Sequence, residues 1–377
     1  MAEINVGILG IGFIGRVHIE AIMRLPGVRL AGLCDENMDL ARLVAAEYNC
    51  AVYSNFVEML DDATIDAIHN CTPNHLHFEI NRMAIEKGKH ILSEKPLAMD
   101  STESTRLLEL SRANPSIACG VCFQYRMYPL VQEYKHKIAS GELGKTRLIH
   151  GRYLQDWLMY DTDYNWRLSK QFAGKTRAIA DIGSHWCDLA QTLTGSRITA
   201  VMADLVNIIP VRQKPKQEIL TFSSANGSVS EPVEIDTEDY GAVMVRFCNG
   251  ASGIFYVSQV SGGHKCGLEI EINTDKCSIA WCQEDNERMW IGHRDEANRV
   301  EIRSALKYAG QYASLPGGHP EGFNDAFKNN LGAFYNYVKG GCKDPSPDFA
   351  TFEDGHDIMR LVDAIVVSSN TKAWVNI

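Results

Sequence analysis

Residues 4–15 read INVGILGIGFIG, an apolar run that leads into three glycines spaced as GxGxxG. The run is typical of a buried strand, and the residues after the glycines are typical of a helix. At such a junction Gly10 permits the turn, Gly12 lets a phosphate approach the backbone, and Gly15 lets helix and strand pack closely. The free N–H groups of the helix then face the phosphates. The stretch therefore predicts a dinucleotide-binding domain, with a glycine-rich turn that binds no ligand as the alternative.

The acidic residue Asp35 stands at the end of a second predicted strand, Val28–Cys34. A carboxylate at this place accepts hydrogen bonds from two ribose hydroxyls and repels a 2′-phosphate. No Lys or Arg follows before Arg42. The sequence therefore favours NAD over NADP.

Charge and composition exclude several classes of partner. The chain of 377 residues has a formal net charge of −10, whereas a nucleic-acid or anionic-membrane surface needs clustered Lys and Arg. No apolar stretch reaches the ~18 residues of a membrane-spanning helix, and a strand begins too early to leave room for a signal peptide. We therefore expect a cytoplasmic protein with no nucleic-acid and no membrane partner.

The eleven cysteines and twelve histidines show no spacing of a disulfide framework or a zinc site. Cys119 and Cys122 form a CxxC, but Ile117–Phe123 around them has the composition of a buried strand, on which positions three apart face opposite sides. The sequence therefore predicts buried reduced thiols and no metal site.

Residues 1–124 alternate short apolar runs with helical periodicity, which is typical of a doubly wound parallel sheet, the Rossmann arrangement. We expect strands at Ile4–Leu9, Val28–Cys34, Ala67–Cys71, His90–Ser93 and Ile117–Phe123. The expected helices are Ile14–Leu25, Leu40–Tyr48, Phe56–Leu60, Leu76–Lys87 and Ser101–Ala113.

Residues 125–377 predict an α+β domain with a large, mostly antiparallel open sheet. The expected strands are Thr146–Gln155, Ile198–Val206, Ala242–Phe247, Ser252–Gln259, Leu268–Asn273, Cys277–Gln283 and Met289–His293. Helices are expected at Leu130–Ser140, Gly322–Lys339 and Phe352–Ser369. The polar segment Gln213–Asp236 predicts a long excursion rather than a domain boundary.

Two further loops lie where ligands collect in a doubly wound sheet, beyond the carboxyl ends of its strands. They are 71–75, with the sequence CTPNH, and 93–96, with the sequence SEKP. Lys95 in the second loop would be a fixed cation that binds a substrate hydroxyl and stabilises a developing alkoxide. A surface lysine beside a turn-forming proline is the alternative.

A second constellation is Asp181 and His185, four residues apart. On a helix they share one face and can address one point. Oxidation of an alcohol requires a base for the hydroxyl proton, and histidine titrates near neutrality. The alternative is an ordinary helix N-terminus with Asp181 or Ser184 as the cap and His185 on the surface.

Together with the GxGxxG turn and Asp35, these motifs resemble the glucose–fructose oxidoreductase, inositol dehydrogenase and rhizopine-catabolism (Gfo/Idh/MocA) family over essentially the whole chain. The resemblance implies that Lys95, Asp181 and His185 form the catalytic group, with His185 as proton acceptor. It also implies a cofactor site that includes Trp166 and Arg167. The residues expected to bind the cofactor are Gly10, Gly12, Phe13, Ile14, Gly15, Asp35, Thr72, Pro73, Asn74, His75, Glu94, Lys95, Trp166 and Arg167.

The chain departs from the family where many members carry a run of glycines before the aspartate. Here the sequence is Thr176-Arg177-Ala178, and Arg177 becomes a candidate substrate contact. Family members often assemble through the C-terminal sheet. We therefore expect a homodimer or homotetramer.

Two segments are candidate walls of a substrate site. Residues 153–166 interleave aromatic rings with carboxylates, which suits a polyhydroxylated ring, and Tyr153 and Trp157 are its candidate contacts. Residues 316–322 form a polar, turn-rich loop with His319 and Glu321 as candidates. Core packing of the aromatics and a plain exposed loop are the alternatives.

The sequence shows no phosphate-specific basic cluster, so we expect an unphosphorylated carbohydrate or polyol substrate. The first hypothesis is an NAD-dependent dehydrogenase that oxidises a secondary hydroxyl of a sugar, glycoside or inositol. The second is a redox-neutral, NAD-dependent glycoside hydrolase on the same fold. The third is a non-catalytic sensor of NAD and sugar, which has no need of a base such as His185.

Overall fold

The computed structural model describes residues 3–216 and 230–377. Its contacts divide the chain into two compact units, Met1–Gln124 with Phe323–Met359, and Tyr125–Gly322 with Arg360–Ile377. The sequence places one domain boundary at residue 124, and the first segment of the first unit ends at that residue. Residues 323–359, expected in the second domain, instead belong to the first unit.

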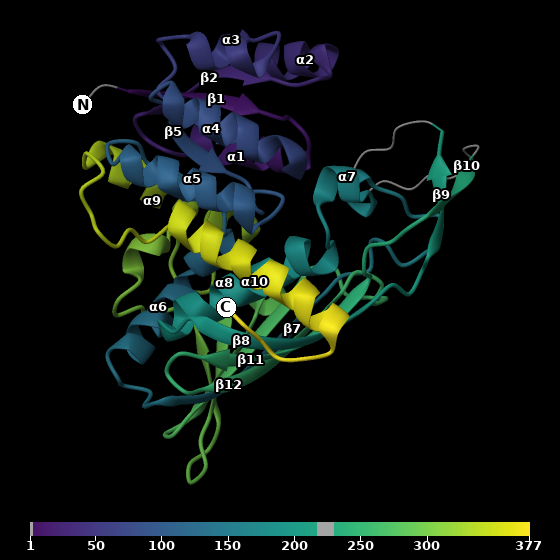
Figure 1. The fold of residues 1–377 in the computed structure, drawn as a ribbon. Helices are drawn as coiled ribbons and strands as arrows, with labels where there is room; N and C mark the ends of the chain where they lie inside the picture. The colour runs from purple at the N-terminus through teal and green to yellow at the C-terminus, as the bar shows by residue number, and fades with distance from the viewer. Residues whose placement is uncertain (1–2, 217–229) are drawn as a thin grey trace. The chain divides into compact units, whose positions relative to one another are not determined.

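The first unit contains, within the described residues, a seven-stranded sheet in the order β17-β6-β5-β4-β1-β2-β3. Its strands are parallel except for β17, which pairs antiparallel with β6. Helices α1 and α4 pack along the strands that they connect (Figure 1). The elements are β1 (Ile4–Leu9), α1 (Phe13–Met23), β2 (Val28–Cys34), α2 (Met38–Tyr48), β3 (Ala51–Val52), α3 (Phe56–Asp61), β4 (Ala67–Asn70), η1 (Asn74–Leu76), α4 (His77–Glu86), β5 (His90–Ser93), α5 (Ser101–Ala113), β6 (Cys119–Val121), α9 (Phe323–Lys339) and β17 (Ala350–Thr351).

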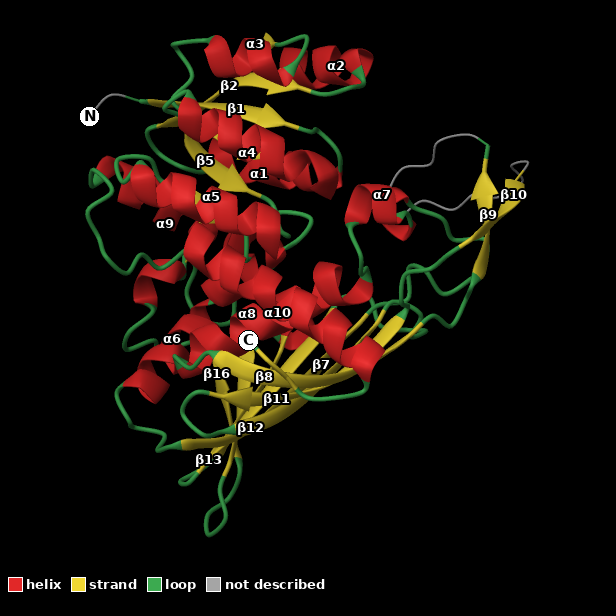
Figure 2. Cartoon of the chain, in the orientation of Figure 1, coloured by secondary structure: helices red, strands yellow, loops and turns green. Residues whose placement is uncertain are grey.

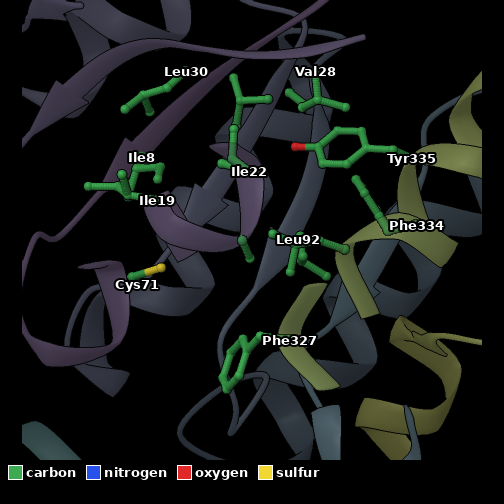
Figure 3. Close-up of a cluster of buried hydrophobic side chains, with 14 of the residues drawn as sticks. Ile8, Ile19, Ile22, Val28, Leu30, Cys71, Leu92, Phe327, Phe334 and Tyr335 are labelled. Atoms are coloured by element: carbon green, nitrogen blue, oxygen red, sulfur yellow. The ribbon is translucent and has the colours of Figure 1, made fainter. Parts of the chain in front are cut away.

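Helix α9 completes the core of the first unit. Phe327, Phe334 and Tyr335 lie in one buried cluster with strand and α1 residues such as Ile8 and Ile22 (Figure 3). Helix α9 packs directly against α1. Burial of each side chain of this size contributes about 1.5–3 kcal/mol of hydrophobic free energy. Residues 323–359 are therefore held to the first unit by its core. This long-range packing is why a boundary read from local composition misses them.

The second unit contains, in the part of the chain that the structure describes, a nine-stranded sheet ordered β16-β15-β14-β13-β7-β12-β11-β8-β18. Its pairs are antiparallel except for β7 with β12. The elements are η2 (Gln124–Met127), α6 (Pro129–Ala139), β7 (Thr146–Leu154), η3 (Trp166–Leu168), α7 (Lys170–Ala173), η4 (Ile179–Gly183), α8 (Ser184–Thr194), β8 (Ile198–Val206), β9 (Val211–Pro215), β10 (Ser230–Glu234), β11 (Tyr240–Phe247), β12 (Ser252–Ser258), β13 (Gly267–Thr274), β14 (Ser278–Cys282), η5 (Gln283–Asp285), β15 (Arg288–Gly292), β16 (Arg299–Ile302), η6 (Gly310–Tyr312), α10 (Phe352–Thr371), which contains the division at residue 359, and β18 (Val375–Asn376).

Helix α8 covers one face of this sheet (Figure 2). Its buried Trp186 stacks on Phe255 of β12, with ring centroids 4.5 Å apart, and donates from Nε1 to the Glu269 carbonyl at 3.2 Å. A Cβ on Gly151 of β7 would lie 2.5 Å from that indole nitrogen. The glycine therefore lets helix and sheet approach closely, which fixes the start of α8 over the sheet.

The expected elements are largely found. The parallel and antiparallel sheets are confirmed, and the helix Ser101–Ala113 and the strand Ile198–Val206 have the expected bounds. The predicted excursion contains the β9–β10 hairpin, and its residues 217–229 lie outside the described residues. Strand β16 was not predicted. Its four residues alternate between charged and apolar side chains, but the run is at the short limit of a strand signal.

Across residues 3–216 and 230–377, no helix has both the length and the apolarity needed to cross a membrane. All eleven cysteines lie in the described residues and are free thiols. Cys119 and Cys122 are buried, as expected.

Candidate active site

The glycine turn of the first unit is built as its motif predicts. Gly10 has φ +87°, and a Cβ there would lie 2.6 Å from the Cys71 carbonyl oxygen. A Cβ on Gly15 would lie 2.0 Å from the Gly10 oxygen, so both positions exclude a side chain. At Gly12 a Cβ would meet nothing within 4 Å.

Gly12 is the N-cap of α1, and no side chain caps this helix. The first turn of α1 also contains no acidic residue, and Phe13 beside Gly12 is exposed. Backbone N–H groups at the positive end of a helix, with no acidic side chain in the first turn, suit a pyrophosphate. This part of the first unit therefore fits a dinucleotide.

Asp35 follows β2 and lies beside the same turn. Its Oδ2 accepts from the Ile11 N–H at 2.6 Å, and its Oδ1 accepts from the Asn37 N–H at 2.9 Å. A carboxylate has about four acceptor positions, so two are left for ribose hydroxyls. The half-buried Asp35 thus positions the turn and keeps the capacity expected for NAD.

The loops after β4 and β5 are tied together by a buried histidine. His77 places Nδ1 2.6 Å from the Pro96 carbonyl oxygen and Nε2 2.8 Å from the Thr72 carbonyl oxygen. Thr72 also donates from Oγ1 to Asn70 at 2.7 Å. Burial lowers the pKa of His77, although both carbonyls favour the charged ring. The link fixes the spacing between the loop of Thr72, Pro73, Asn74 and His75 and the loop that carries Lys95.

Lys95 and Glu94 are neighbours that differ in their exposure to solvent. Lys95 is half-buried, whereas Glu94 is 6% exposed. Glu94 accepts from the Lys95 N–H at 3.2 Å and contacts His18 Nε2 at 3.0 Å. Glu94 is therefore an interior anion behind the lysine rather than a direct contact of a cofactor at the surface.

In the second unit, Asp181 lies in a short π-helix, Ile179–Gly183, that continues into α8. Gln259, just after β12, donates from Nε2 to Asp181 Oδ2 at 2.8 Å. The Arg167 guanidinium lies 3.7 Å from Oδ1 and 4.4 Å from the centroid of the Trp166 ring. Widened turns of this kind occur often at functional sites, because they re-aim side chains.

His185 lies in the first turn of α8 and is 4% exposed. Its ring meets the ring of Tyr125 edge-on, with centroids 4.7 Å apart, and lies 6.3 Å from that of Tyr153. Neither Asp181 nor Ser184 caps the helix, because Asp181 accepts from Gln259 and Ser184 donates to the Ala180 carbonyl. The alternative of a plain helix start with a surface histidine is therefore wrong.

The hydroxyl groups of Tyr125 and Tyr153 are 2.7 Å apart, and each lies 3.1 Å from the Cys266 sulfur. Burial raises the pKa of both tyrosines well above the ordinary value. The pair therefore stays protonated and packs as a polar floor beneath His185. Tyr153, predicted as a substrate contact, is a buried member of this floor.

Trp157 is half-buried and donates from Nε1 to Gln155 Oε1 at 2.9 Å. Its ring packs against a small core formed by Leu158, Leu168 and Ile235. The aromatic wall predicted from residues 153–166 is thus mainly packed structure around the site. The alternative of core packing holds for Trp157.

Arg177 requires a correction. Its side chain is 0% exposed and pairs with Asp239, which also binds Arg212 at 2.9 Å. The Arg177 N–H donates to Glu238 at 2.9 Å, and the guanidinium donates to the Glu238 carbonyl at 3.0 Å. The side chain that replaces the family's glycines therefore anchors the segment before Asp181 to the two residues that precede β11 and is not available as a surface contact.

Glu321 and His319 also differ from expectation. Glu321 is 4% exposed, pairs with the buried Arg303 at 2.9 Å and accepts from the Ser314 N–H at 2.7 Å. His319 is exposed, and its carbonyl accepts from Arg303 at 2.7 Å. Glu321 thus stabilises the loop through Arg303 and Ser314 and does not face solvent. His319 is the exposed one of the two candidates.

Each unit brings together one part of the predicted set. The first gathers the glycine turn, Asp35 and the two loops, and the second gathers Asp181, His185, Trp166, Arg167 and Tyr153. The sequence analysis missed Gln259, Tyr125, His77 and His18. Gln259 ends a predicted strand of the mostly antiparallel sheet, to which the ligand rule for doubly wound sheets does not apply, so no sequence signal singles it out.

Comparisons with known proteins identify the family. A model of an oxidoreductase family with an NAD-binding Rossmann fold, Gfo/Idh/MocA, matches residues 4–121, and the model of the family's C-terminal domain matches residues 131–280. Levoglucosan dehydrogenase of Pseudarthrobacter phenanthrenivorans is 30% identical over 100% of this chain and 99% of its own length.

Solved structures give the same result over the whole chain. Levoglucosan dehydrogenase in complex with NADH and levoglucosan is 28% identical, with a TM-score of 0.88 over 100% of this chain and 99% of that chain. An oxidoreductase domain protein from Kribbella flavida is 28% identical, with a TM-score of 0.91 over 100% of both chains. The chain described here thus belongs to the Gfo/Idh/MocA family of NAD-dependent oxidoreductases.

Proposed function

We propose that this protein oxidises a secondary hydroxyl of an unphosphorylated sugar, glycoside or inositol by hydride transfer to NAD. The observation that carries the proposal is the fixed Asp181 carboxylate, held by Gln259 four residues before the buried His185. A base and an orienting carboxylate on consecutive turns are what removal of a hydroxyl proton requires. The full-length relative named levoglucosan dehydrogenase supports a small, uncharged sugar.

The proposed roles follow from the chemistry of each group. His185 accepts the hydroxyl proton, Asp181 orients the hydroxyl or the base, and Lys95 offers a cation to the oxygen on which negative charge develops. The turn Gly10–Gly15 and Asp35 would hold the cofactor, which supplies the hydride acceptor when bound. The polar floor of Tyr125 and Tyr153 limits water around His185.

The experiment is NADH absorbance with the purified protein, NAD and a panel of free sugars, inositols, levoglucosan and aryl glycosides. Steady accumulation of NADH on one subset supports the dehydrogenase and names its substrate class. Release of an aglycone that needs NAD but yields no NADH would favour the redox-neutral hydrolase. Saturable sugar binding with neither product would favour the sensor.

Two variants sharpen this experiment. His185→Ala should abolish most turnover, whereas His136→Ala, on α6 and stacked on Tyr308, should not. Replacing NAD by NADP in the same assay tests the preference that Asp35 predicts, and faster turnover with NADP would contradict that role.

We further propose that the second unit assembles into a homodimer or homotetramer through the outer face of its sheet. Met244, Ile254 and His150 form one row across β11, β12 and β7. Met244 is 40% and Ile254 49% exposed, and Leu148 on the same face of β7 is 51% exposed. An apolar patch of this kind on a sheet usually marks an interface.

The free thiols support a reducing compartment. Eleven cysteines without a disulfide are typical of proteins that stay in the cytoplasm. We therefore propose that the protein works there. Secretion into the medium by the native host would contradict this.

A further inference from the structure

Four polar side chains form a buried chain in the first unit, behind the loop that carries Lys95. Tyr335 Oη lies 2.7 Å from His69 Nε2, His69 Nδ1 lies 2.9 Å from His18 Nδ1, and His18 Nε2 lies 3.0 Å from Glu94 Oε1. The two histidines are 0% exposed, Tyr335 is 1% and Glu94 6%. They come from α9, β4, α1 and the end of β5.

The direction of these hydrogen bonds follows from the acceptor at one end. A carboxylate only accepts, so His18 must donate from Nε2 to Glu94. If His18 is neutral, its Nδ1 then accepts, and His69 must donate from Nδ1. His69 Nε2 then accepts a hydrogen bond from the Tyr335 hydroxyl. One assignment of the protons therefore satisfies every member, with all three bonds running toward Glu94.

Charging either ring conflicts with this assignment. A proton added at His18 Nδ1 would face the N–H of His69 unless His69 changed tautomer, accepted at Nδ1 and donated from Nε2 to a Tyr335 oxygen that became an acceptor. Burial and the neighbouring His18 lower the pKa of His69 well below its ordinary value. Other titratable groups that face the chain are Cys71, Cys122, Lys95 and Asp66.

Glu94 is ionised at the end of the chain. Burial would raise its pKa, but the hydrogen bond and the Coulomb interaction with His18, the nearby Lys95 charge and the Cys122 thiol lower it. Cys122 itself stays a thiol, because burial and Glu94 raise its pKa. A buried carboxylate is stable only where donors and a cation surround it, as they do here.

We propose that Tyr335, His69 and His18 form a one-directional hydrogen-bonded wire that holds Glu94 as a buried anion beside Lys95, so that His18 and His69 are positioning residues for the Lys95 cation. The role for Lys95 rests on the sugar oxidation proposed above. The wire fixes the loop from its interior side, whereas His77 ties its backbone to the neighbouring loop. Without the wire, Glu94 would lose its ionised form and Lys95 its fixed counter-charge.

A metal ion is the competing occupant of the same place. Ligand atoms of His18, Glu94 and Cys122 all lie within 4.8 Å of one another. An ion would require a thiolate at Cys122 and a lone pair on His18 Nε2. The bonds within the cluster are instead those of a thiol and an N–H donor, with Asn330 donating to the Cys122 sulfur at 3.5 Å. The observations therefore favour the wire.

The first test reads the tautomers directly in the full-length protein labelled with ¹⁵N-histidine. We expect His18 protonated at Nε2 only and His69 at Nδ1 only from pH 6 to 8, with resonances assigned through His18→Gln and His69→Gln. Opposite tautomers, an imidazolium at either ring, or a stoichiometric metal in the purified protein would overturn the wire. This readout needs no turnover, so it is independent of the proposed reaction.

The second test compares His69→Leu with His69→Gln, whose amide can still donate to His18 and accept from Tyr335. We expect His69→Leu to lower kcat about tenfold with an unchanged KM for NAD, and His69→Gln to stay within about threefold of the unmodified protein. Tyr335→Phe should act in the direction of His69→Leu, and Tyr337→Phe on the same helix is its matched control. Equal loss in His69→Leu and His69→Gln at equal thermal stability would overturn the positioning role.

A third measurement separates failure of the wire from failure of the proposed function. The rate at which Lys95 is acylated by a small reagent, read by mass spectrometry, reports its environment without any substrate. Glu94→Gln and His69→Leu should change this rate at least about twofold, and His69→Gln should not. An unchanged rate in all three would overturn the link to Lys95, whatever the substrate panel yields.

Discussion

Gln259 holds the carboxylate of Asp181, with its amide nitrogen Nε2 2.8 Å from Oδ2. Gln259 is 0% exposed, whereas the Asp181 side chain is 17% exposed, so this hydrogen bond is partly shielded from solvent. The second oxygen of Asp181 faces the Arg167 guanidinium at 3.7 Å. The carboxylate is therefore fixed from both sides before any substrate binds, which is the preorganisation that catalysis by charged groups needs.

Gln259→Leu should remove that hold while keeping a similar volume. We expect kcat/KM for the sugar to fall about 10- to 100-fold, because Asp181 loses a charge-assisted hydrogen bond worth about 1.5–3 kcal/mol. The dissociation constant of NADH, measured by fluorescence, should not change. Gln283→Leu, which removes another buried amide that contacts Tyr128, is the control and should retain activity.

His185→Ala should lower turnover by about 10²- to 10⁴-fold, the usual contribution of a general base, and leave NADH binding intact. Steady-state kinetics and a binding titration check the two parts separately. Turnover equal to that of the unmodified protein would remove His185 from the mechanism.

Gly12→Ala should weaken NADH binding, whereas Gly15→Ala should lower the stability of the protein. At Gly12 the added Cβ meets no protein atom within 4 Å, so the melting temperature should stay unchanged while NADH binding weakens about tenfold. At Gly15 the Cβ would lie 2.0 Å from the Gly10 oxygen, so the protein itself should be destabilised. Thermal melting and an NADH titration of both variants give the comparison. Tight NADH binding by Gly12→Ala would contradict the pyrophosphate site.

Asp239→Asn should destabilise the second unit by about 3–5 kcal/mol, because Arg177 and Arg212 would be left as buried, unpaired cations. Burial raises the pKa of Asp239, but Arg177, the Ile209 N–H and Arg212 lower it below the ordinary value. A lowered pKa in the folded state gives stability that is present above the unfolded pKa of about 3.9 and is lost as the pH falls through the folded value. Urea unfolding between pH 3 and 6 should therefore show a shallower pH dependence for Asp239→Asn. An equal slope for both proteins would exclude this carboxylate as a source of acid sensitivity.

Ile254→Glu should dissociate the proposed assembly without unfolding the chain. The side chain is 49% exposed on the outer face of β12, so a charge there is tolerated in the isolated chain and repelled in a sheet-to-sheet interface. Light scattering should show a smaller mass for this variant. Leu43→Glu, at an exposed position on α2, is the control, and an unchanged mass for Ile254→Glu would place the interface elsewhere.

Local sequence patterns predict most of the elements. Helix Ser101–Ala113 is marked by Asp100, whose side chain accepts from the Thr102 and Glu103 N–H groups as a cap does. The glycine turn is predictable because the GxGxxG spacing is local and directly follows an apolar strand. The fold class, the family and NAD as cofactor are confirmed by the comparisons.

What could not be predicted depends on partners far along the chain. From the sequence alone Arg177 is a candidate substrate contact, but in the fold it is paired with Asp239 and Glu238. In the same way, Glu321 is paired with Arg303. The π-helix at Asp181 has no composition signal of its own. The roles of Lys95, Asp181 and His185 stay predictions, to be decided by the measurements above.

The return of residues 323–359 to the first unit has a consequence for biosynthesis. Residues 1–124 leave the ribosome 199 residues before Phe323, a delay of roughly 10–40 s at about 5–20 residues per second. During this time the nascent domain lacks Phe327, Phe334 and Tyr335, and its apolar surface under α9 is open to chaperones. A product truncated at residue 124 would keep that surface exposed permanently, so we expect it to aggregate or be degraded rather than accumulate as a free NAD-binding domain.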